Sequence, residues 1–500
     1  MRTKKSIFNL IADILPQVII SVLGFIRIRV FLSAIGTEQL GVYQLFGQIL
    51  CYLALAELGL TSAVMYYLYK PIHEKNYKKI SQIIVGAKKS FTAIMFVMFI
   101  CGVILAPNVK FFIADTTLSN TFIIIAFIMT ILVNILSYFS TPYVLLFDSN
   151  QEKYKYIVWS QLVVSVRYIV EMIAIWLTKN LYVALAIEII FTLIQNFVIK
   201  RLFKKNYDYV DMKADKDLSF WSKTKDLIPH KIGSLVAFNI DVIILSKFLG
   251  LTNVVIYNCY YYITNTISNL IGKMGAATLA GVGNLIVAEP KKVYKVFLEY
   301  NSMLFFLAIV ICIPLGIVIS PFVNLWYGSD MVVSGFTVFL FAFILFYGII
   351  RIVLNTFCTA AGIFRPTLIC TYLEIIINLV VSLLLIKKYE ITGLLFGTAL
   401  SLVFSEFVIK PFILNKHLFK DKIYKYYLDC FKYIIIAMIN LVSLSLLSNY
   451  FNYNNLLLWF IFGCIIFIIN LLITSLMFKL INKFEFINRL NIFKKEKKHA

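Results

Sequence analysis

Long apolar runs alternate with short polar connections along almost the whole chain. A membrane-spanning helix needs about 20 mostly apolar residues, and most of these runs reach that length. The pattern predicts about fourteen spanning helices, at residues 6–33, 39–67, 81–106, 119–147, 155–177, 181–203, 227–249, 253–286, 294–320, 332–361, 366–386, 391–415, 426–448 and 455–480. We therefore expect an all-α polytopic membrane protein.

The composition excludes a soluble protein. Hydrophobic residues make up 61% of the 500 residues and the mean hydropathy is +0.87, whereas soluble domains contain about 45–50% apolar residues. The N-terminus, MRTKKSIFNLIADILPQVIISVLGFIRIRVFL, is basic and then apolar, like a secretory signal peptide. Its apolar part is too long for a signal peptide and lacks a small-residue cleavage site, so we expect it to remain as the first span.

Lysine and arginine are concentrated on alternate connections. The basic connections are the N-terminus, 68–80, 148–154, 204–226, 287–293, 362–365, 416–425 and the C-terminal tail, and the opposite ones hold only Lys110, Lys179, Lys387 and Lys388. Because positively charged loops stay in the cytoplasm, this distribution predicts a multi-pass plasma-membrane protein with both termini cytoplasmic. The net charge of +22 follows from that topology, so we expect no nucleic-acid partner.

The connections and the cysteines exclude several kinds of chemistry. The outer connections are too short for a catalytic domain, which argues against an envelope enzyme such as a glycan polymerase or ligase. The eight cysteines lie inside apolar runs without a CxxC motif, and the four histidines lie at or beyond the ends of these runs. We therefore expect no disulfide framework, no metal site and no cofactor.

Two similar stretches indicate an internal repeat. GTEQLGVY begins at Gly36 and GLTNVVIY begins at Gly250, 214 residues later. Parallel repeats of six spans typically form two lobes that open alternately to the two sides of the membrane; coincidence is the alternative, because small residues are common where membrane helices meet. The repeat predicts an N-terminal lobe at 1–203, an inter-lobe loop at 204–226, a second lobe at 227–417, and two further helices with a basic tail at 418–500.

Three segments carry a family resemblance. ELGLTSAVMYYLYKPIHEKNYKKI, from Glu57, resembles the second-span signature of bacterial polysaccharide flippases, and so do DVIILSKFLGLTNVVIYNCYYYI, from Asp241, and AGVGNLIVAE, from Ala280. These flippases belong to the multidrug/oligosaccharidyl-lipid/polysaccharide exporter superfamily. The resemblance implies a transporter that flips an undecaprenyl-pyrophosphate-linked oligosaccharide from the inner to the outer leaflet. It also implies contact with membrane lipids, coupling to H⁺ or Na⁺, and contacts with a glycan polymerase and glycosyltransferases.

Several charged residues lie inside the predicted spans. Each would cost about 2.5–3.5 kcal/mol if it faced lipid at the midplane, so we expect them to be paired or to face a hydrated cavity. Arginine suits phosphate oxygens because its planar fork donates two parallel hydrogen bonds. The candidates for binding the pyrophosphate are Arg27, Arg29, Lys273 and Arg351. Arg27 is favoured over Arg29, since the two lie about 200° apart around a helix.

A second group of charges suits gating or ion coupling. It contains Glu57, Asp241, Arg167, Glu171 and Glu374. Arg167 and Glu171 are four residues apart, so a self-neutralising pair on one helix face is the alternative for these two. The 214-residue offset also gives Arg27 and Asp241 equivalent positions in the two repeats, with opposite charges. We therefore expect these two side chains to meet when the outer gate closes.

Two other transport functions stay open on this sequence. A lipid II-type flippase would have the same fold and number of spans and would differ only in its substrate. A cation-coupled multidrug antiporter of the same superfamily would favour twelve spans and an acidic residue in the first one, where this chain has arginines.

Overall fold

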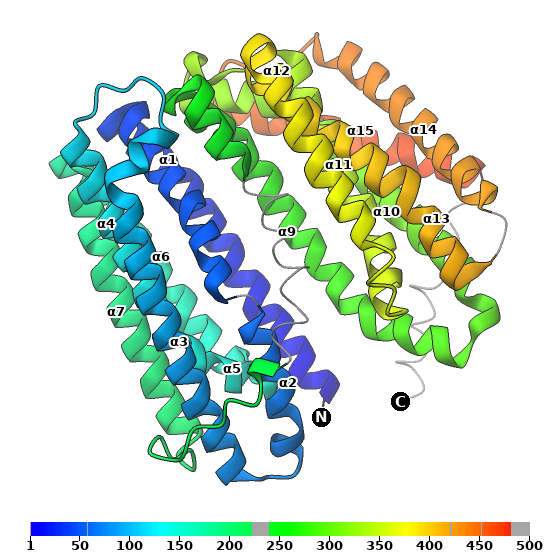
Figure 1. Cartoon of the computed structure of the whole chain (residues 1–500). Coiled ribbons are helices and arrows are strands. Elements are labelled where there is room, and N and C mark those ends of the chain that lie inside the picture. Colours follow the sequence, from blue (N-terminus) through cyan, green and yellow to red (C-terminus); the bar gives the residue numbers. More distant parts are fainter. Residues whose placement is uncertain (1, 58, 223–239, 421–422, 452, 482–500) are drawn as a thin grey trace. The chain divides into compact units, whose positions relative to one another are not determined.

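The computed structural model describes residues 2–57, 59–222, 240–420, 423–451 and 453–481, and every regular element in them is helical (Figure 1). The helices follow the predicted apolar runs, so the all-α fold class is confirmed. Ten helical stretches in the described ranges are long and apolar enough to cross a membrane, and two of them, Pro16–Leu53 and Leu368–Phe419, each include residues of two predicted spans. The predicted span at 39–67 is not one helix, because a helix ends at Leu53 and the next α-helix begins at Leu60. The predicted span at 227–249 lies partly outside the described residues.

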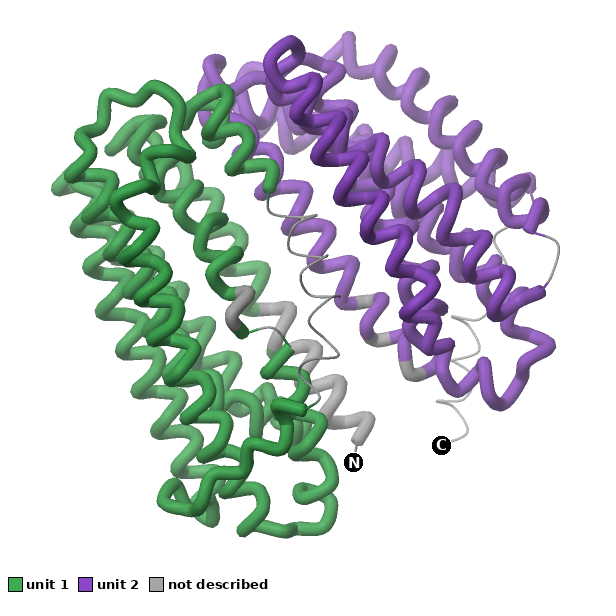
Figure 2. Tube along the Cα trace, in the orientation of Figure 1, with its two compact units in different colours: residues 1–255 green, residues 256–500 purple. Residues whose placement is uncertain are grey.

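The chain forms two compact units, Met1–Val255 and Ile256–Ala500 (Figure 2). The first contains α1 (Arg2–Leu53), η1 (Ala54–Glu57), α2 (Leu60–His73), α3 (Tyr77–Leu105), η2 (Ala106–Phe112), α4 (Asn120–Ser137), α5 (Thr141–Ser149), α6 (Tyr154–Thr178) and α7 (Leu181–Asn206). Residues 240–249 are also helical. Helix α6 packs against both α1 and α7, and α4 packs against α7. The predicted lobe boundary at 204–226 remains a prediction.

The second unit begins within α9 (Leu251–Ala288). It continues with η3 (Pro290–Lys292), α10 (Val293–Tyr327), η4 (Ser329–Met331), α11 (Gly335–Ala360), α12 (Leu368–Leu402), η5 (Val403–Ile409), α13 (Lys410–Leu414), η6 (Asn415–Phe419), α14 (Tyr424–Ser448) and α15 (Leu456–Leu480). Helix α10 lies at its centre, in contact with α11, α14 and α15. The two C-terminal helices therefore pack on the second unit.

Helix α1 is broken at Gly36, where φ is 75°. A side chain would strain this left-handed conformation, which glycine adopts freely. A similar break interrupts α12 at Glu390, where φ is 50°. Each of these long helices therefore contains residues of two predicted spans, on either side of a residue with positive φ.

The left-handed residues support the internal repeat. Gly36 and Gly250, 214 positions apart, have φ of 75° and 84°. Gln151 and Gly362 form a second left-handed pair, and Lys179 and Glu390 a third, each 211 positions apart. The offset shortens because residues 138–140 form a turn that splits α4 from α5, whereas α11 is continuous. The two halves therefore share one plan of helices and breaks.

The first part of the inter-lobe loop is fixed to α3. The backbone N–H of Asp217 donates to the carbonyl of Gln82 at 3.0 Å, and its carboxylate lies 2.8 Å from Nζ of Lys79. The indole of Trp221 donates to Ser90 at 3.0 Å. A Cβ at Gly86 would overlap the backbone carbonyl of Asp217, so glycine permits this close approach. We call residues 207–222 the docked segment.

Candidate functional site

A buried charge network lies inside the first unit and begins at Arg27 on α1. Its Nε is 2.7 Å from a carboxylate oxygen of Glu171 on α6, and its Nη2 donates to the hydroxyl of Tyr43 at 2.9 Å. The Arg27 side chain is 12% exposed and that of Glu171 is fully buried. Arg27 is thus held by an acid on a neighbouring helix and by a phenol on its own.

Arg167 and Glu188 complete this network. Nη1 of Arg167 is 2.8 Å from Glu188 on α7, and Nε of Arg167 is 3.4 Å from Glu171. The Tyr43 hydroxyl donates to Glu188 at 3.1 Å. Two arginines and two glutamates are therefore linked into one group of zero net charge, which removes most of the cost of burying them. The predicted Arg167–Glu171 pair is present, but it is one part of a larger network.

The break at Gly36 brings Tyr43 to Arg27. Sixteen residues of straight helix would separate the two by about 24 Å. Since the tyrosine hydroxyl accepts a hydrogen bond from Arg27 at 2.9 Å, the chain must turn back at the break. The Gly36–Tyr43 spacing that revealed the repeat therefore also builds this site.

Aromatic rings surround the Arg27 guanidinium. Its central carbon lies 4.5 Å from the ring centroid of Phe31, 5.0 Å from that of Tyr43 and 4.9 Å from that of Tyr168. Cation–π attraction of this kind contributes about 0.5–2 kcal/mol. The rings therefore hold the planar guanidinium in one place while leaving it positively charged.

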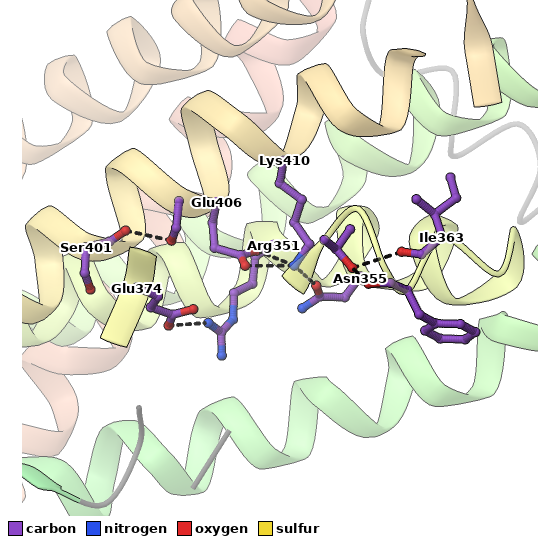
Figure 3. Close-up of polar contacts among 10 residues, drawn as sticks. Arg351, Asn355, Ile363, Glu374, Ser401, Glu406 and Lys410 are labelled. Atoms are coloured by element: carbon purple, nitrogen blue, oxygen red, sulfur yellow. Dashed lines mark hydrogen bonds and ion pairs between the residues drawn. The ribbon is translucent and has the colours of Figure 1, made fainter. Parts of the chain in front are cut away.

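A second charge cluster lies in the second unit (Figure 3). Nζ of Lys410 lies 2.8 and 2.9 Å from the two carboxylate oxygens of Glu406 and 2.5 Å from Oδ1 of Asn355. Next to them, Nη1 of Arg351 on α11 lies 3.5 Å from Glu374 on α12. This cluster also contains two cations and two acids, and so it too has no net charge.

The helix that carries Glu406 is irregular. Residues Val403–Ile409 form a π-helix, η5, and Asn415–Phe419 form another, η6. Short π-helical segments often mark functional positions in helices. At the matching repeat position α7 is α-helical throughout and carries Gln195, which donates to Ser160 at 2.6 Å. A neutral polar contact in the first half thus corresponds to a charged cluster in the second.

The predicted site residues divide between these clusters and other places. Glu57 ends η1 and accepts a hydrogen bond from Thr61. Arg29 is exposed, Asp241 is buried and Lys273 on α9 is partly exposed, and each of these three takes part in an interaction. The predicted residues that build the two charge clusters are Arg27, Arg167, Glu171, Arg351 and Glu374.

Sequence reasoning left Tyr43, Glu188, Asn355 and Lys410 without an assigned role. The spacing of four residues between Glu406 and Lys410 indicates an ion pair on one helix face. Tyr43 and Asn355 gave no such signal, because their roles depend on how separate helices pack. In the described ranges, no group of three or more Asp, Glu, His or Cys is arranged to hold a metal ion.

The second unit also contains an apolar cavity of about 490 Å³. It lies among α10, α11 and α14, and its lining includes Phe305, Ile313, Phe343, Tyr347, Ala437 and Leu441. A cavity with these walls is suited to a hydrocarbon chain.

The comparisons with known proteins give one family and one fold. Residues 7–280, more than half of the chain, match the family described as "Polysaccharide biosynthesis protein". No curated protein sequence matches the chain. Among solved structures, the lipid II flippase MurJ in an inward closed conformation aligns with a TM-score of 0.69 at 16% identity, over 95% of this chain and 99% of that one.

Two multidrug transporter structures have the same fold. An inward-facing MATE family transporter of the MOP superfamily aligns with a TM-score of 0.59 at 13% identity, over 79% of this chain and 96% of that one. A eukaryotic MATE transporter, AtDTX14, aligns with a TM-score of 0.58 at 12% identity, over 85% and 96%. At these identities the likeness shows the fold alone. The chain therefore has the fold that these MurJ and MATE structures share, is a multi-pass membrane protein, and belongs to the polysaccharide biosynthesis protein family.

Proposed function

We propose that this protein moves undecaprenyl-pyrophosphate-linked oligosaccharide repeat units from the inner to the outer leaflet of the bacterial plasma membrane, for surface polysaccharide synthesis. The family supports the pathway. The observation that carries the substrate class is Arg27, a guanidinium fixed by three aromatic rings inside the first unit. Its natural ligand is an anion with two oxygens in one plane, such as a phosphate group.

The Arg27 network suits an exchange of anions. Glu171 occupies the position that a phosphate oxygen would take beside Nε of Arg27. When the pyrophosphate replaces it, Glu171 keeps Arg167 as a partner, because Arg167 Nε already lies 3.4 Å away. The exchange therefore leaves no buried carboxylate alone, which would cost several kcal/mol.

The lipid part of this substrate needs an apolar surface. The cavity among α10, α11 and α14 provides one, and burial of hydrocarbon contributes about 0.8 kcal/mol per CH₂ group. In this proposal the polyprenyl chain lies along these helices.

We further infer that the two lobes give access to the two membrane sides in turn, and that both termini are cytoplasmic. Arg27 changes partner in this cycle: it binds Glu171 in the present structure and Asp241 when the outer gate closes. A double charge swap, Arg27→Asp with Asp241→Arg, should transport better than either single swap. Equal loss in all three variants would refute the gate.

A binding experiment tests the substrate class. The purified full-length protein should bind undecaprenyl pyrophosphate, and Arg27→Ala should weaken this binding by on the order of tenfold, about 1.4 kcal/mol. Lys89→Ala, which removes an exposed lysine of α3, is the matched control and should bind as the wild type does. Equal binding by the wild type and Arg27→Ala would refute the role of Arg27.

The same binding experiment distinguishes the alternative transport functions. Binding of lipid II in preference to other lipid-linked glycans would assign a lipid II-type flippase. Binding of hydrophobic cations, with no affinity for lipid pyrophosphates, would assign a multidrug antiporter.

A further inference from the structure

The two buried acids of the second unit have unequal partners. Both carboxylate oxygens of Glu406 are within 2.9 Å of Lys410, and Lys410 is also held by Asn355. In the described part of the chain, the only polar contact of Glu374 is with Arg351, at 3.5 Å. Glu374 is 8% exposed, so water compensates it little.

A carboxylate in such a position has two ways to avoid the cost of burial. It can be paired closely with cations, as Glu406 is, or it can accept a proton and become neutral. The contact at 3.5 Å is longer than the 2.7–2.9 Å of a charge-assisted hydrogen bond. Glu374 is therefore the acid of this cluster that is best placed to exchange a proton.

The charged groups around Glu374 come from three elements: Arg351 on α11, Glu406 on η5 and Lys410 on α13. Glu406 and Lys410 hold each other and nearly cancel. The charge that responds to the protonation of Glu374 is therefore that of Arg351. The side chain of Arg351 is 21% exposed, and the side chain of Glu374 is 10% exposed. Of the two side chains, that of Arg351 is therefore the more accessible to a ligand.

We propose that Glu374 is a proton-exchange site whose protonation releases Arg351 to bind a phosphate of the substrate. The step is an exchange of partners: one proton from water adds to a carboxylate oxygen of Glu374, the ion pair with Arg351 ends, and Arg351 pairs with the phosphate. The net charge of the cluster rises from zero to +1. For its ligand the inference rests on the proposed function, and it deepens that function by naming a proton site that is linked to phosphate binding.

The direction of the coupling follows from linkage. A phosphate that binds only when Glu374 is protonated draws a proton into the protein. Affinity should therefore fall as the pH rises above the titration of Glu374, by up to about tenfold per pH unit for one proton. Conversely, adding the ligand should protonate Glu374.

Infrared difference spectroscopy on the purified full-length protein tests the titration without any substrate. Lowering the pH should produce the carbonyl stretch of a protonated carboxylic acid in the wild type. Glu374→Gln should lose the component of that band that Glu374 contributes, whereas Glu38→Gln, which removes an acid of the first unit, should keep this component. In Arg351→Gln the band should persist to higher pH, because the carboxylate has lost its cation. A band that is unchanged in Glu374→Gln, or a titration unaltered by Arg351→Gln, would overturn the proposal, and so would a titration displaced by Na⁺ but not by K⁺.

Adding undecaprenyl pyrophosphate at a pH just above the midpoint then tests the coupling. The Glu374 band should grow in the wild type, and Glu374→Gln should bind this lipid with an affinity that does not depend on pH. Binding without growth of the band would overturn the proposal. A normal titration together with no binding of the lipid at any pH would count against the proposed substrate, while the titration results stand.

Discussion

Asn470 on α15 donates its side-chain amide to the carbonyl oxygens of Ile309 and Val310 on α10, at 3.0 and 3.2 Å. Pro314 lies four residues after Val310 and has no N–H to donate, so the helix itself leaves that carbonyl unpaired. The indole N–H of Trp459, also on α15, donates to the backbone carbonyl of Val318 at 2.8 Å, close to Pro321. The last helix thus pairs the carbonyl that Pro314 leaves without a donor, as a buried backbone group in a membrane requires.

Replacing Asn470 by Leu should therefore destabilise the protein. The substitution leaves the buried carbonyl of Val310 without a donor, at a cost of about 1–2 kcal/mol. The matched control is Asn440→Leu, since Asn440 is equally buried but bonds only within its own helix, to Ile436. Thermal unfolding in detergent should show the larger loss for Asn470→Leu; equal losses would contradict the bridging role.

The docked segment should depend on Gly86. Gly86→Ala places a methyl group on the backbone carbonyl of Asp217, and relieving such an overlap costs about 1–3 kcal/mol. We expect residues 207–222 to become sensitive to limited proteolysis. Gly47→Ala, where a Cβ meets open space, should leave that segment protected; cleavage at the same rate in both variants would show that the contact does not hold the segment.

The docking should also depend on pH through Asp217. Burial alone would raise the pKa of this carboxyl, but hydrogen bonds from Lys79 and Ser219 outweigh it and hold the pKa below its usual value. A group with a lowered pKa stabilises the folded state above its unfolded pKa, about 4, and loses that effect as the pH falls through the folded value. The segment should therefore be docked at neutral pH and loosen in acid.

Fluorescence of Trp221 reports this transition, because its indole bonds to Ser90 in the docked state. Subtracting the signal of Trp221→Phe isolates it from the other tryptophans. Asp217→Asn should show weaker docking at neutral pH and no transition in acid. The same acid transition in Asp217→Asn would assign the pH dependence to another group.

The distribution of basic connections predicts that the C-terminus is cytoplasmic. A fluorescent protein that folds only in the cytoplasm, fused after residue 500, should fluoresce, and alkaline phosphatase at the same place should be inactive. The opposite pair of results would mean that every connection lies on the other side of the membrane from the one predicted. It would also place the docked segment on the outer side.

The fold could be predicted from the sequence because a lipid environment requires long apolar runs. The repeat could be predicted because Gly36 and Gly250 occupy left-handed positions that favour glycine. It found the Arg167–Glu171 pair, since that spacing is local to one helix. It did not find the contact of Arg27 with Glu171, which are 144 residues apart. Long-range partners depend on helix packing, and one sequence does not encode them as a pattern.

The irregular helical segments of the second unit also could not be predicted from the sequence. A π-helix such as η5 differs from an α-helix in that its hydrogen bonds span five residues instead of four, and no residue type marks it in the way that glycine marks a left-handed turn. The fixed 214-residue offset matched Gly36 to Gly250, but it missed the pairs at Gln151 and Lys179, whose partners lie 211 positions on. A turn within the fourth predicted span changes the offset, and hydrophobicity alone does not show it.

The most direct test of the central claim is the leaflet distribution of lipid-linked intermediates in cells that lack this gene. Undecaprenyl-linked oligosaccharides would be extracted after labelling the outer leaflet with a membrane-impermeant reagent. The account predicts that complete repeat units accumulate unlabelled on the inner leaflet, and that the wild type and Lys89→Ala, but not Arg27→Ala, restore labelling and surface glycan. Normal labelling in the deletion strain, with surface glycan unchanged, would contradict it.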